Sequence, residues 1–355
     1  MATTALSGQY PPIWVHAYLD ETESVQRILK TTPDVIELRG GNAHSTPLGV
    51  AVLNGNIALV TILLDAGANP SSADLEGTSD SNPVAKASRQ NDLEILSLLL
   101  EYGGEVSTAT IINAASYNRY DVMGLLLGSG ADVESRNRRG RTPLHIASLG
   151  DNRNLFHVLV GYDADVHAEA DNGATPLHYA AHKDNAILVQ NLLRLGASVS
   201  ARTNGLGSAV APISNGATPL HYAAMGGGEN ALILLLDQGG DDKAVDSRGE
   251  TLLHYAAKKG RAAIVRLLIE REVDLEPKAI PRAGEQDLTP ARMAIINGHF
   301  GIAVLLQTAI VLREEIRERK REAFAMGHHK RLGEASRIYG LDDLALQLIL
   351  EKVPV

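Results

Sequence analysis

The chain has 355 residues, a formal net charge of −9 and no cysteine. The lack of cysteine excludes disulfide bonds, thiolate catalysis and cysteine-ligated zinc or iron–sulfur centres. The acidic balance disfavours broad attraction to nucleic acid or to an anionic membrane surface. Aromatic residues make up only 4% of the chain, so a folded core must consist mainly of aliphatic and alanine side chains.

Residues 1–11 predict an N-terminal extension without the basic and apolar regions of a secretory signal. The most apolar later stretch, residues 300–312, is too short to cross a bilayer and predicts a packed helix. We therefore expect a cytoplasmic protein, with the nucleus as a second compartment, that neither enters a membrane nor binds nucleic acid.

One phrase recurs along the chain, as TPLHYAA at Thr175 and Thr218 and as TLLHYAA at Thr251. In this phrase the threonine can cap a helix, the proline suits the first turn, and the leucine and alanines follow at helical spacing. A second apolar run follows, ending in a glycine suited to a left-handed helix end. Equivalent positions lie 36, 27, 33, 33, 43, 33 and 38 residues apart, at Thr46, Asn82, Ala109, Thr142, Thr175, Thr218, Thr251 and Thr289.

A period of 33 residues with T-P-L-H-x-A resembles the ankyrin-repeat family, and the resemblance covers residues 12–312 as about nine units. It implies an all-α solenoid of stacked helix-turn-helix units with β-turn or hairpin fingers, because one unit cannot bury its own apolar face. We predict an extension over 1–11, the array over 12–312, and a C-terminal helical cap or tail over 313–355.

The recurring histidines predict structural struts: His145, His178, His221 and His254. Metal ligands must converge on one point, whereas equivalent positions of stacked repeats are spread along the array. The motif GLGSAV at 205–210 lacks the strand, the third glycine and the helix of a phosphate cradle. We therefore predict no catalytic residue, no metal and no cofactor.

The spacing also predicts where the repeats carry insertions or deletions. Ten extra residues fall between Thr175 and Thr218 and five between Thr251 and Thr289, which indicate either recognition loops or tolerated drift. About six residues are missing before Ala109, so we expect a notched rim there. Asp163 and Glu272 replace the glycine of the left-handed helix end.

The family's variable positions are the turn residues before the threonine and the two residues after the alanine pair. The resemblance places the partner contacts at Arg136, Arg138, Arg139, Arg141, Leu149, Asp171, Asn172, His182, Lys183, Asn215, Met225, Arg248, Lys258 and Lys259, and the same rule includes Glu250. Four arginines share the turn RNRRGR, which indicates either a site for carboxylates or phosphates of a partner or a solvated turn.

The predicted function is a scaffold or adaptor that binds a partner protein through the concave face and the fingertips. We expect the protein to be a monomer and the partner to present an acidic segment. Residues 341–350 form a short amphipathic stretch that either caps the array or is similar to an F-box-like or SOCS-box-like tail. Its Leu341-Asp342 departs from the F-box Leu-Pro, and the SOCS-box cysteine is absent. Two alternatives follow: a ubiquitin-ligase substrate receptor that uses residues 323–355, and an enzyme with a small-molecule pocket on the concave face.

Overall fold

The computed structural model describes residues 10–41, 44–74, 81–150, 152–205, 215–280 and 288–325, with side chains up to residue 321. Its described part contains eighteen α-helices, one short 3-10 helix (η1, Pro33–Val35) and no strand. Three isolated β-bridges close turns, such as the one between Val245 and Thr251. The all-α class that the repeat indicated is confirmed.

The helices form nine consecutive hairpins, as the repeat count predicted. The first helices are α2 (Pro12–Tyr18), α4 (Pro47–Asn54), α6 (Pro83–Gln90), α8 (Thr108–Ser116), α10 (Pro143–Leu149), α12 (Pro176–His182), α14 (Pro219–Gly226), α16 (Leu252–Lys258) and α18 (Pro290–Ile296). The second helices are α3 (Thr22–Thr31), α5 (Ile57–Asp65), α7 (Leu93–Glu101), α9 (Tyr120–Gly128), α11 (Arg153–Gly161), α13 (Ala186–Arg194), α15 (Glu229–Asp237), α17 (Ala262–Glu270) and α19 (Phe300–Ala325).

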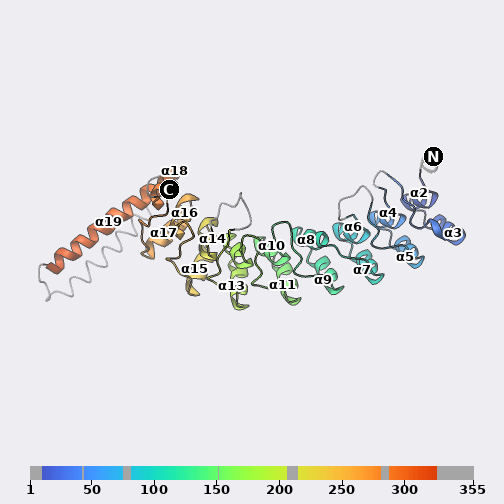
Figure 1. Cartoon of the computed structure of the whole chain (residues 1–355), viewed down its shortest axis with the longest axis horizontal. Helices are drawn as coiled ribbons and strands as arrows, with labels where there is room; N and C mark the ends of the chain where they lie inside the picture. The colour runs from blue at the N-terminus through green and yellow to red at the C-terminus, as the bar shows by residue number, and fades with distance from the viewer. Residues whose placement is uncertain are drawn as a thin grey trace. The chain divides into compact units, whose positions relative to one another are not determined.

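The chain divides into an N-terminal body, residues 1–147 with 151–165, and a C-terminal body, residues 148–150 with 166–355. Within each body the first helices pack in chain order, α2 on α4 on α6 on α8 and α12 on α14 on α16 on α18 (Figure 1). Leucine, alanine, isoleucine and valine dominate the buried side chains. The core is therefore aliphatic, as the composition required, and each hairpin buries its apolar face against its neighbours.

The histidine of the repeated phrase joins one hairpin to the next. The backbone N–H of Thr175 donates to Nδ1 of His178 at 3.1 Å. Because an N–H can only donate, Nδ1 is the acceptor and Nε2 carries the proton, which it donates to the carbonyl of Ala217 at 3.3 Å. The same bonds run from His221 to the Glu250 carbonyl at 3.2 Å and from His254 to the Leu288 carbonyl at 2.8 Å. For His178, His221 and His254 the prediction of a structural strut is confirmed, while Nδ1 of His145 accepts the N–H of its own cap Thr142 at 3.1 Å.

The two non-glycine residues at left-handed helix ends keep the backbone conformation of the glycine that they replace. Asp163 and Glu272 have φ values of 60° and 57°, so both adopt the left-handed helix end that a glycine takes in most repeats. One boundary needs correction: α8 is capped by Ser107, whose hydroxyl accepts the N–H of Thr110 at 3.1 Å, and not at Ala109. Alanine offers no side-chain acceptor, so the helix begins at the nearest residue that does.

Two sets of predictions fall outside the described residues. Most of the insertion around 201–217 and of the shorter one after Pro277 belongs to undescribed stretches, at 206–214 and 281–287, and so do residues 326–355. The described part of residues 313–325 continues α19 without a break. Within the described residues, none of the helices combines the length and the apolar character that spanning a membrane requires.

Candidate partner-binding surface

The arginine turn, residues 136–141, joins α9 to α10 in a closed conformation. The side chain of Asn137 accepts the N–H groups of Arg139 at 2.9 Å and Arg141 at 3.1 Å. Gly140 takes φ 66°, a value that favours glycine. Arg136, Arg138 and Arg139 are exposed and Arg141 is half-buried. The turn thus holds several guanidinium groups in a small surface region of an acidic protein.

The predicted notch lies just before this turn. Only three residues separate Gly103, at the end of one hairpin, from the cap Ser107 of the next. The short link is held in place, since Glu105 N–H donates to the hydroxyl of Ser71 at 2.8 Å and the Asn82 amide donates to the Glu105 carbonyl at 3.2 Å. Such a link is too short to form a projecting finger beside the arginine turn.

In the C-terminal body, neighbouring fingers are hydrogen-bonded to one another. Its turns are joined by backbone hydrogen bonds, from Asn204 to the Asn172 carbonyl at 3.0 Å and from Ser247 to the Asn215 carbonyl at 2.7 Å. The fingers there support one another along their length. The α7–α8 link provides no finger for such a bond, so the arginine turn is open on the side of the notch.

The other predicted contact residues belong to the C-terminal body and differ in exposure. Asp171, Lys183, Asn215 and Lys259 are exposed, whereas the following are half-buried: Leu149, Asn172, His182, Arg248 and Lys258. All of these can offer at least part of a side chain to a partner.

Met225 requires a correction, because only 7% of it is exposed. Gly226 follows it, and a Cβ there would lie 2.0 Å from the carbonyl oxygen of His182. This glycine lets α14 approach α12 closely, which draws Met225 into the packing between repeats. Met225 therefore does not provide the exposed contact that its position in the repeat indicated.

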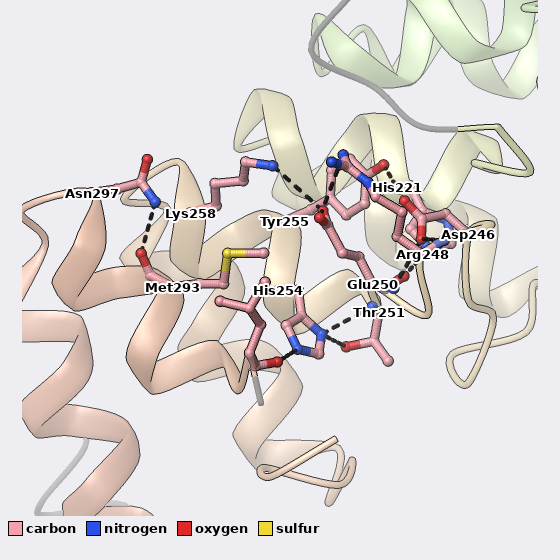
Figure 2. Close-up of polar contacts among 11 residues, drawn as sticks. His221, Asp246, Arg248, Glu250, Thr251, His254, Tyr255, Lys258, Met293 and Asn297 are labelled. Carbon is pink, nitrogen blue, oxygen red and sulfur yellow. Dashed lines mark hydrogen bonds and ion pairs between the residues drawn. The ribbon is translucent and has the colours of Figure 1, made fainter. Parts of the chain in front are cut away.

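Glu250 is a second correction, since the residue is 2% exposed although the positional rule placed it at the surface. Its two carboxylate oxygens lie 3.4 Å from Arg248 Nη2 and 3.6 Å from Lys258 Nζ. Figure 2 shows both cations directed at this carboxylate. Arg248 and Lys258, which the sequence analysis treated as separate contacts, thus share one buried anion.

Asp246 fixes the turn that carries Glu250. Its Oδ1 accepts the N–H groups of Arg248 at 2.8 Å and Glu250 at 2.9 Å, and Tyr255 Oη donates to Oδ2 at 2.9 Å (Figure 2). Burial lowers the pKa of the adjacent His221 to about 4, against the opposing effect of the Asp246 carboxylate. His221 is therefore neutral at physiological pH and acts as a fixed hydrogen-bond bridge.

The N-terminal body carries further exposed residues that were not predicted as contacts. The positional rule, applied to the second, third and fourth hairpins, gives Leu53, Arg89 and Tyr117, all exposed, with Tyr117 at 69%. The guanidinium of Arg119 lies 5.6 Å from the centre of the Tyr117 ring. Tyrosine and arginine are the residue types that dominate binding energy at interfaces. The same rule would have found these residues had it been carried to the earlier repeats.

The cavities of the described chain resemble surface recesses between repeats. One of about 300 Å³ in the C-terminal body is lined mainly by apolar residues, including Val245, Leu252, Leu253 and Pro277. Among the described residues, histidine, aspartate and glutamate form no group of three that could hold a metal ion. The enzyme alternative stays a prediction.

Comparison with known proteins agrees with the fold. The family model "Ankyrin repeats (3 copies)" matches residues 111–203, 188–279 and 220–316, and the model "Ankyrin repeat" matches residues 44–75.

Three relatives match part of the chain. The nuclear factor NF-kappa-B p105 subunit of Gallus gallus is 32% identical over 145 residues, which cover 37% of this chain and 14% of that protein. Protein PhlB of Serratia liquefaciens is 33% identical over 131 residues, which cover 35% of this chain and 56% of that protein. Potassium channel AKT2/3 of Arabidopsis thaliana is 29% identical over 133 residues, which cover 36% of this chain and 16% of that protein. The matched part therefore spans between 14% and 56% of these relatives. Nine consecutive helical hairpins, the histidine struts of the C-terminal body and the family models lead to one conclusion: the chain belongs to the ankyrin-repeat family.

Proposed function

We propose that this protein binds a partner protein, as a scaffold or adaptor, through the turns and first helices of its repeats. Ankyrin repeats generally mediate protein–protein interaction, which supports binding as the general activity. The observation that carries the proposal is the exposed arginine turn beside the α7–α8 notch. An open side lets an extended segment lie along the turn without meeting a neighbouring finger.

The partner segment is acidic in this proposal. The planar guanidinium group donates two parallel hydrogen bonds to a carboxylate, and several such groups lie within residues 136–141. The whole chain, these arginines included, has a net charge of −9, so the turn is a local basic feature of an acidic protein and can attract an anion. One exposed ion pair contributes about 0 to 1 kcal/mol, so the affinity requires several of them together.

Exposed aromatic and apolar residues provide the rest of the affinity. Tyr117 and Leu53 are 69% and 47% exposed on the first-helix side of the N-terminal body. In this proposal the acidic segment is oriented by the arginine turn, while an apolar side chain of the partner packs against Tyr117. Charge then determines encounter and specificity, and apolar burial slows dissociation.

The test is capture by crosslinking from a cell lysate with three versions of the full chain. These are the natural sequence, R138E/R139E, and the control R27E/R194E, which changes the charge equally at exposed arginines of α3 and α13. We expect a specific protein recovered with the natural chain and the control and at least tenfold less with R138E/R139E. Equal recovery with all three would remove the arginine turn from the interface.

A further inference from the structure

The last repeat exposes a position that every preceding repeat buries. In the first eight hairpins the residue that aligns with Ala181 of the phrase TPLHYAA is at most 4% exposed: Ala17, Val52, Ser88, Ala115, Ser148, Ala181, Ala224 and Ala257. The equivalent residue of the ninth hairpin is Ile295, which is 51% exposed. A small residue is usual at this position, and the ninth hairpin carries a large, branched, apolar one.

This position faces the following hairpin. A Cβ on Gly228, at the start of α15, would lie 2.8 Å from the carbonyl oxygen of Ala181, so the next repeat covers it closely. The Arg119 side chain likewise donates a hydrogen bond to the carbonyl of Ser88. Ile295 therefore belongs to the face on which a tenth repeat would stack, and the described chain contains no tenth repeat.

We call Ile295 and three further exposed apolar residues of the ninth hairpin together the terminal apolar patch. It comprises Ile295, Ile296, Phe300 and Val304, the last three exposed at 62%, 64% and 57%. Phe300 and Val304 are one helical turn apart on α19 and share a face. Single exposed apolar residues are ordinary, but a cluster at the open end of a stack marks an interaction site, because solenoids need polar terminal faces to remain soluble.

We propose that residues 341–350 of the same chain pack on the terminal apolar patch as a closing helix. Their sequence, LDDLALQLIL, places Leu341, Leu344 and Leu348 at helical spacing on one face. This inference does not depend on the partner proposed above.

The chain is long enough for this return. From Val304 to the end of α19 at Ala325, the helix rises about 32 Å. Residues 326–340 can span up to about 50 Å when extended. The linker 326–340 is therefore longer than the distance that it must cover, and the segment 341–350 can reach the patch.

Charge supports the same occupant. Arg292, half-buried on α18, occupies the position that His254 holds in the preceding repeat, from which the next repeat is contacted. The segment begins its predicted helix with Asp342 and Asp343, and a carboxylate in the first turn both favours the helix and complements an arginine. The segment thus matches the patch in apolar character and in charge.

The natural absence of cysteine makes a disulfide test direct. The full chain carrying I295C and L344C is oxidised mildly and compared with L195C/L344C, since Leu195 is 45% exposed at the end of α13, away from the patch. We expect a disulfide within one chain to form at least tenfold faster in the first pair. Equal rates in the two pairs, or no disulfide in either, would overturn the proposal.

The same experiment distinguishes this segment from a second copy of the chain as the occupant of the patch. A disulfide-linked dimer formed by I295C alone would show that a second copy covers the patch, and would also overturn the proposal. As an independent readout, L344D/L348D should increase amide hydrogen exchange of residues 290–304 several-fold while residues 47–65 stay unchanged. Unchanged exchange in both regions would contradict the packing of the segment on the patch.

Discussion

In each body a polar contact joins a first helix to the stretch of chain that precedes it, but the two bodies use different side chains. In the C-terminal body, Tyr255 lies four residues after its cap and donates to the buried Asp246 at 2.9 Å. In the N-terminal body, Lys86 occupies the equivalent position and its Nζ lies 2.9 Å from the carboxylate of Asp74. The side chains of this pair are 3% and 8% exposed, so a full ion pair is buried where the other body uses a neutral phenol.

The preceding repeat makes room for this charge. Gly49 stands where other repeats have the histidine strut, and a Cβ there would lie 2.7 Å from Lys86 Nζ. The ammonium therefore uses space that an imidazole fills elsewhere. Neutral bridges and charged bridges tolerate change differently, because a buried charge that loses its partner is far more costly than a lost neutral hydrogen bond.

The largest expected effect is on the charged bridge. D74N leaves the Lys86 ammonium buried without its counter-ion, and burial already lowers the pKa of Lys86. We expect the free energy of unfolding to fall by about 4 kcal/mol. Urea unfolding measures it, with D241N at an exposed turn position as the control. A loss equal to that of the control would show that the pair contributes no stability.

A neutral histidine strut of the C-terminal body, His221, should respond to pH instead. The pKa of His221 is about 4 in the folded chain, below its ordinary value near 6.5. The unfolded chain therefore takes up a proton first as the pH falls, so the stability from this group is complete above about pH 6.5 and is lost towards pH 4. The loss should reach about 3 kcal/mol.

Comparison of the natural chain with H221Q isolates this effect. Urea unfolding between pH 7 and pH 4.5 should show a clearly smaller pH dependence in H221Q, because the titrating group is gone. Parallel pH dependences in the two proteins would contradict the buried neutral state of His221.

The smallest expected effect concerns the space around Lys86. G49A places a methyl group against the ammonium and should cost about 2 kcal/mol through overpacking. In a K86M background the flexible thioether side chain can adjust, so the same change should cost less than about 1 kcal/mol. A double-mutant cycle measures this coupling, and equal costs in both backgrounds would mean that Gly49 does not accommodate Lys86.

The regular part of the fold could be predicted because each repeat carries the same residue types at the same helix positions. Helix caps, alanine spacing and the His178 strut follow from a phrase of seven residues. The burial of Met225 and Glu250 could not be predicted, because it depends on how closely adjacent repeats approach. The Lys86–Asp74 pair was missed for a related reason: Lys86 takes the tyrosine position of the phrase, but Asp74 lies outside the phrase and Gly49 makes room from another repeat.

The candidate surface was predicted in part. The arginine turn and the notch were visible as composition and spacing. The open side of the turn follows only from the hydrogen bonds of the α7–α8 link, whereas Tyr117 could have been found by applying the positional rule to the fourth hairpin.

Binding by the arginine turn is tested most directly by the dissociation constant of the captured partner, measured at two salt concentrations. The account predicts at least tenfold weaker binding for R138E/R139E than for the natural chain at low salt, a smaller difference at high salt, and no more than a twofold change for R27E/R194E. Equal affinities of R138E/R139E and the natural chain at low salt would contradict it.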